Sequence, residues 1–140
     1  MQREYTQGRV LLGALPNGED LLEVITRAAK DAGIKTGTFQ LFGACYNSVV
    51  ACYSPEQDRY LETKVDVFTE ITAGLGTISI KDGEMHLHCH LTLVDEQGKV
   101  YGGHLMPGSR LFAGEYQITE LIGEPMVRQL DPKTGLYLWK

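Results

Sequence analysis

The spacing of apolar residues most limits what this chain can fold into, because only one segment has the period of a helix. Between residues 19 and 32 the apolar positions that share one helical face are Leu21, Leu22, Ile25, Ala28, Ala29 and Ala32. Glu19 and Asp20 place carboxylates in the first turn, where they suit the helix dipole, and Gly33 is a stop signal. We therefore predict one main α-helix over residues 19–32.

The other segments are rich in β-branched and aromatic residues and are separated by turn signals. Strands are predicted over residues 9–15, 37–53, 59–72, 75–80, 84–94, 99–105 and 110–122. Gly43 is expected to form a bulge, and Gly74 and Gly76 to separate two strands. This order predicts an α+β fold: a highly twisted antiparallel β-sheet packed against one main α-helix, in a single domain spanning residues 1–140.

Charge and hydropathy argue against several classes of partner. The formal net charge is −5 and the arginines are scattered singly, so no phosphate-binding basic patch is visible. No apolar run approaches the roughly 20 residues that span a bilayer, and no signal-type apolar segment opens the chain. The three cysteines form no C-x-x-C pair, which is typical of reduced thiols in a cytosolic protein. We expect a cytoplasmic protein that binds neither nucleic acid nor membranes.

All four histidines lie in one predicted β-hairpin, residues 84–106. His86, His88 and His90 alternate with apolar residues, so they should share one face of a strand while the apolar residues face the core. His104 lies on the returning strand. It joins the histidine face if Asp95 pairs with Lys99, and it turns to the opposite face if the pairing shifts by one residue. A three-residue loop with Gly98 in the left-handed position favours the first register.

Three neutral imidazoles that converge from two adjacent strands suit zinc, with a fourth position left for water or substrate. The alternative is that these histidines are polar residues of a solvated or subunit-contact face. Gly102 and Gly103, directly before His104, indicate either a close backbone approach by a ligand or neighbouring chain, or a bulge. The two-residue spacing and the cross-strand histidine favour a metal site.

The order of motifs along nearly the whole chain resembles the PPC domain (plants and prokaryotes conserved). The matching segments are 18–22, 43–44, 53–56, 76–79, 81–83, 86–88, 95–100 and 102–105, of which H-L-H and G-G-H-L are the most distinctive. The resemblance implies an antiparallel sheet on one principal helix and a homotrimer. It also implies that His86, His88 and His104 occupy the family's histidine positions, with His90 an addition.

A more distant similarity is to acetolactate decarboxylase, which holds zinc through an H-x-H pair and a later histidine. This similarity supports the metal hypothesis by analogy of fold only.

Two functions compete. The first is a zinc-dependent lyase or hydrolase acting on a small carbonyl or ester compound. In it His86, His88 and His104 hold the metal, while His90, Gly102 and Gly103 lie beside the ligands or the substrate. The second is a non-enzymatic trimeric protein-interaction module. A DNA-binding regulator related to the AT-hook proteins of plants is disfavoured, because the chain is acidic and has no Arg-Gly-Arg-Pro segment.

Overall fold

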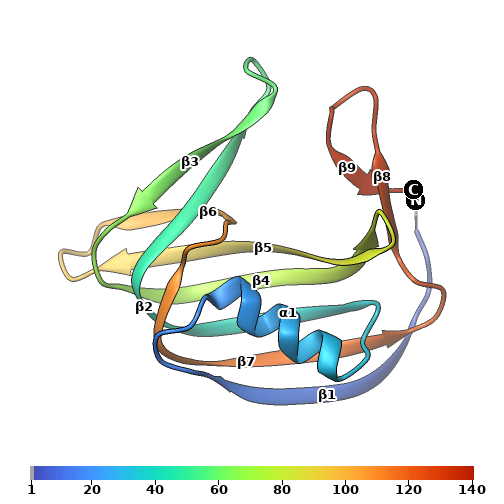
Figure 1. Cartoon of the computed structure of the whole chain (residues 1–140), viewed down its shortest axis with the longest axis horizontal. Coiled ribbons are helices and arrows are strands. Elements are labelled where there is room, and N and C mark those ends of the chain that lie inside the picture. Colours follow the sequence, from blue (N-terminus) through green and yellow to red (C-terminus); the bar gives the residue numbers. More distant parts are fainter. Residues whose placement is uncertain (1) are drawn as a thin grey trace.

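One helix and nine strands make up the computed structural model, which describes residues 2–140 (Figure 1). The helix is α1 (Leu21–Asp31). The strands are β1 (Thr6–Leu15), β2 (Gly37–Ser54), β3 (Arg59–Val65), β4 (Thr69–Lys81), β5 (Glu84–Asp95), β6 (Val100–Leu105), β7 (Arg110–Ile122), β8 (Val127–Leu130) and β9 (Tyr137–Trp139). All strands belong to a single twisted sheet, so the α+β expectation is confirmed as a mainly-β chain with one helix. Within residues 2–140, no helix has the length and apolar character needed to cross a membrane.

The helix begins and ends close to the predicted positions because both of its caps are encoded locally. The Asp20 carboxylate accepts a hydrogen bond from the Glu23 N–H at 3.0 Å, which satisfies one of the free donors of the first turn. Gly33 follows the helix with a φ of 69°. The second Asp20 oxygen accepts from the Gly108 N–H at 2.7 Å and ties the helix start to the loop before β7.

The long strand β2 lets the sheet turn. Its first half pairs with β7 and β4, and its second half pairs with β3 and, at two residues, with β6. The register shifts beside Gly43, as predicted, and a Cβ atom there would collide with the carbonyl oxygen of Ala113. Because β2 changes partners along its length, β6 and β5 come to lie between its second half and β4.

The strand break expected at Gly74 and Gly76 lies elsewhere, between residues 66 and 68, and β4 runs through both glycines. A Cβ atom at Gly74 would crowd the Leu41 side chain, and one at Gly76 would collide with the ring of Phe39. These glycines therefore leave room for neighbouring side chains across the sheet, and they do not form a turn. The prediction was wrong because the sequence does not reveal which side chain lies opposite a glycine.

Two hairpins rise from the sheet on the side away from α1 (Figure 1). One is β2–β3, and the other is the C-terminal β8–β9 pair, which the sequence did not predict. Strands of four and three residues are too short to show a period of two. The hairpins meet where the Tyr53 hydroxyl donates to the Thr134 carbonyl oxygen at 2.9 Å, and β8 runs parallel to the end of β4.

Candidate metal centre

The pairing of β5 with β6 brings the histidines of the two strands together. His90 lies directly opposite His104, and the Asp95 N–H donates to the Lys99 carbonyl oxygen at 3.0 Å. This is the register that the three-residue loop predicted, and Gly98 has the left-handed φ of 77°. Directly paired residues point to the same face of a sheet, so all four histidines share one face. The residues that alternate with them, Leu87, Cys89 and Leu91, are buried in the core.

His88, His90 and His104 form a compact group whose candidate ligand atoms all lie within 4.8 Å of one another. The Nε2 atoms of His88 and His90 are 3.1 Å apart. Two nitrogens bound to a tetrahedral zinc at about 2.0–2.1 Å would be separated by about 3.3 Å. The spacing of this pair is therefore close to that of two ligands of one ion, and the ring of His104 lies 4.8 Å from that of His88.

His86 shares the histidine face and lines the same cavity as His88 and His104, but it is not part of the compact group. The compact group includes His90, whereas the motif resemblance implied a set that includes His86 instead. Which three histidines bind a metal therefore stays a prediction.

Two observations indicate that the group suits a metal ion. Burial and neighbouring positive charges lower the pKa of His88 and of His104 to about 4, so both imidazoles are neutral at pH 7, as ligation requires. Among the described residues, Nδ1 of His104 has no hydrogen-bond partner although it is buried. Buried polar atoms nearly always have a partner, so this nitrogen is a place for a bound ion or its ligand.

Arg128, from β8, lies against the outer side of His88. Its Nη2 atom is 3.3 Å from His88 Nδ1. Because a guanidinium only donates, Nδ1 accepts here and the proton of neutral His88 lies on Nε2, facing His90. A metal ion held at Nε2 would require this proton to move to Nδ1, and Arg128 would then have to release its contact with Nδ1.

A cavity of about 230 Å³ opens beside the histidines. Its walls come from β3, β4, β5, β6 and the C-terminal hairpin, through Tyr60, Lys81, His86, His88, His104, Arg128, Gly135, Leu136, Tyr137 and Leu138. The ring centroid of Tyr60 is 5.0 Å from that of His104. Sequence analysis missed Tyr60, Lys81 and Arg128, because nothing in their local sequence indicates that they meet the histidines.

Gly102 and Gly103 allow β6 to fit between its two neighbours. A Cβ atom at Gly103, where φ is 150°, would lie 2.6 Å from the Ala51 carbonyl oxygen of β2. A Cβ atom at Gly102 would lie 2.8 Å from the Leu91 carbonyl oxygen of β5. The close backbone approach that the glycine pair indicated is made here by strands of the same chain, and it sets the depth of His104.

The sequence profile of the Plants and Prokaryotes Conserved (PCC) domain matches residues 2–122. The chain belongs to this family, which is the PPC family that its motifs resemble. The matched part of the PCC domain includes all four histidines, whereas Arg128 and the C-terminal hairpin lie beyond it.

Two solved structures are similar to this PCC domain over its whole length. One is a metal-containing protein from Archaeoglobus fulgidus, with 33% identity, a TM-score of 0.94, and coverage of 100% of this chain and 99% of that chain. The other is a plant- and prokaryote-conserved protein from Pyrococcus horikoshii, with 33% identity, a TM-score of 0.93, and coverage of 100% and 96%.

More distant matches support fewer conclusions about this chain. A Staphylococcus aureus protein described as similar to alpha-acetolactate decarboxylase shares 13% identity over 84% of this chain and 53% of that one, with a TM-score of 0.53. This confirms the expected similarity at the level of fold alone. The bifunctional protein GlmU of Synechococcus sp. is 28% identical over 84% of this chain, and the match covers only 18% of that protein's length.

Proposed function

We propose that this PCC domain binds a zinc ion through His88, His90 and His104, and that the site acts on a small carbonyl or ester compound. The observation that carries the proposal is the compact group of three histidines, with two Nε2 atoms 3.1 Å apart. The metal-containing relative from Archaeoglobus fulgidus, at 33% identity over nearly its full length, supports it. His86 lies outside the group, at the wall of the cavity, where it is placed to contact a bound compound.

Zinc with three protein ligands keeps a fourth position open, lowers the pKa of a bound water to about 7 and polarises a carbonyl group. The chain's own residues contribute the enclosure. Tyr60 and the C-terminal hairpin form walls of the cavity beside His104. Walls of this kind hold a small compound beside the histidines and limit its contact with bulk water, which favours lyase or hydrolase chemistry on a small substrate.

Metal content of the purified full chain tests this proposal. We expect about one zinc per chain, an anomalous peak at the zinc edge between β5 and β6, and loss of zinc in His88→Ala. Glu115→Ala, which removes an exposed carboxylate on β7, is the control and should keep full occupancy. A chain that stays metal-free after incubation with zinc, or a peak at another place, would contradict the proposal.

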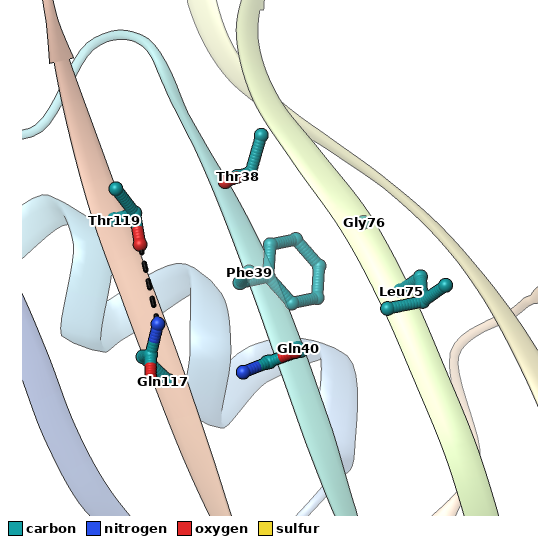
Figure 2. A pocket seen from close by; sticks show the side chains of 7 residues that line it. All are labelled: Thr38, Phe39, Gln40, Leu75, Gly76, Gln117 and Thr119. Carbon is teal, nitrogen blue, oxygen red and sulfur yellow. Dashed lines mark hydrogen bonds between the residues drawn. The ribbon is translucent and has the colours of Figure 1, made fainter. Parts of the chain in front are cut away.

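A second proposal concerns assembly. We infer that the chain forms a homotrimer through the sheet face opposite α1. One cross-strand row on that face runs through Gln117, Gln40, Leu75, His90 and His104. Figure 2 shows Gln117, Gln40 and Leu75 around a pocket in front of the sheet, with the helix behind it. Leu12 pairs with Gln117 at the β1 end of this row, and Leu12 and Leu75 are 78% and 64% exposed. Exposed apolar side chains that share one sheet face favour a subunit contact there.

Sedimentation of Leu75→Lys tests the assembly. We expect three chains per particle for the parent chain and a shift toward monomer for the variant, because a buried unpaired ammonium is costly. Leu130→Lys on β8 introduces the same charge at a similarly exposed leucine and should leave the trimer intact. A monomeric parent chain would contradict the trimer and would leave the metal proposal standing.

A further inference from the structure

We propose that the cavity beside the histidines binds a small organic anion, with a carboxylate or phosphate group, held by Arg128 and Lys81. This inference names the substrate class of the site proposed above, and it depends on that proposal only for the role of the metal. Arg128 lies outside the matched part of the PCC domain, so the anion site is argued from this chain's own C-terminal hairpin.

Arg128 is a buried cation that forms no salt bridge with a carboxylate among the described residues. It is 8% exposed. Its guanidinium donates to the Ser79 hydroxyl at 2.9 Å, the Tyr137 carbonyl oxygen at 3.1 Å and the Thr77 hydroxyl at 3.3 Å. These neutral acceptors and the ring of Trp139, whose centre is 5.3 Å from the guanidinium carbon, orient the group. No carboxylate among the described residues balances its charge, which is costly in a protein interior.

The wall of the cavity is positively charged. Lys81 lies on the same wall, with its Nζ atom 3.8 Å from the centre of the Tyr137 ring. No carboxylate from residues 2–140 lines the cavity, although the chain as a whole carries a net charge of −5. Two cations gathered in a concave, partly buried site of an acidic protein form a local field that attracts anions.

Binding of an anion in this cavity should be coupled to binding of the metal. A zinc ion in the histidine group would add two positive charges near Arg128, which already contacts His88. An anion between the metal and the two cations neutralises this repulsion, so metal and anion should each strengthen the binding of the other. The cavity of about 230 Å³ is small, which limits the ligand to a compound of a few carbon atoms.

Calorimetric titration of the metal-stripped full chain tests the inference at low ionic strength. Inorganic phosphate and succinate serve as separate probes, so the preferred probe shows whether the anionic group is a phosphate or a carboxylate. We expect saturable binding of one probe at one site per chain. Arg128→Gln and Lys81→Gln should each weaken that binding about tenfold or more, because each removes a charge-assisted contact.

The controls separate the site from net charge and from folding. Lys64→Gln and Arg59→Gln remove exposed cations from β3, outside the cavity, and should bind the probe as the parent chain does. Arg128→Lys keeps the positive charge and should retain most of the affinity, which separates loss of the charge from loss of the arginine side chain. Far-ultraviolet circular dichroism checks each variant.

Absence of binding by both probes, or equal binding by Arg128→Gln, Lys81→Gln and the controls, would overturn the inference. Because the chain is stripped of metal, neither result depends on zinc. A chain that binds phosphate or succinate but never zinc would instead contradict the proposed function alone.

Discussion

The two faces of β5 differ in what determines them. Leu87, Cys89 and Leu91 face α1 and the core, and their burial follows from alternation and apolar character alone. The histidines of β5 lie on the other face, where His86 and His88 line the cavity with neighbours from β6, β3 and the C-terminal hairpin. The core face can therefore be predicted from one strand, whereas the chemistry of the histidine face depends on elements far away in sequence.

Cysteine labelling gives the largest expected difference between the faces. Cys89 lies between His88 and His90 in sequence, but it is buried, and burial raises the pKa of its thiol to about 12. Against an ordinary thiol pKa of 9.0, this shift lowers the thiolate fraction about a thousandfold at pH 8. Iodoacetamide followed by peptide mass spectrometry should modify exposed Cys52 and spare Cys89. Fast labelling of Cys89 in the folded chain would show that β5 presents its faces the other way round.

Truncation on the core face should reduce stability strongly. Leu93 is fully buried in the core cluster, so Leu93→Ala should lower the free energy of unfolding by about 2–5 kcal/mol, measured in urea. Thr92→Ala, at the exposed neighbouring position, should change it by less than about 0.5 kcal/mol. Similar losses in the two variants would mean that both faces of β5 are packed.

Truncation on the histidine face should change zinc affinity instead. His90→Ala should lower the affinity about a hundredfold, because it removes a ligand of the compact group, while His86→Ala should have a much smaller effect. Competition with a zinc chelator measures both. The reverse ranking would favour the set His86, His88 and His104 that the motif resemblance implied.

The predictable part of the fold is the part with local causes. The helix stop at Gly33, the bulge at Gly43 and the turn that ends at Gly98 each depend on a few adjacent residues, and each lies where the sequence predicted it. The turn then fixed the pairing of His90 with His104, so the shared histidine face followed from alternation and one register.

The rest depends on partners that are distant in sequence. Gly76 is a glycine because the ring of Phe39 lies against it, and the C-terminal hairpin is held by contacts with β2 and β4. The same holds for Arg128, which is 40 residues from His88 and meets it only in the folded sheet. A lone arginine in the sequence shows no sign of its burial, so the basic wall of the cavity could not be predicted.

The smallest expected effect is on zinc affinity in a variant of Arg128, and there we expect the substitution to raise the affinity. A metal-bound histidine normally donates the N–H of its second ring nitrogen to an acceptor, and loss of that acceptor lowers the affinity for the metal. Here the outer partner of His88 is a guanidinium, which can only donate and which adds a positive charge. Arg128→Gln supplies an amide oxygen as acceptor and removes the charge, so zinc should bind about tenfold more tightly in buffer free of phosphate and carboxylates.

Chelator competition measures this gain, and Arg59→Gln is the control, because it removes an exposed positive charge that does not line the cavity. Adding the preferred anion should then narrow the difference between Arg128→Gln and the parent chain, since only the parent retains both cations that hold the anion beside the metal. Weaker zinc binding in Arg128→Gln would mean that the guanidinium supports the ligand set through its contacts with Ser79 and Thr77. In that case its positive charge would matter less to the metal than the position it gives to His88.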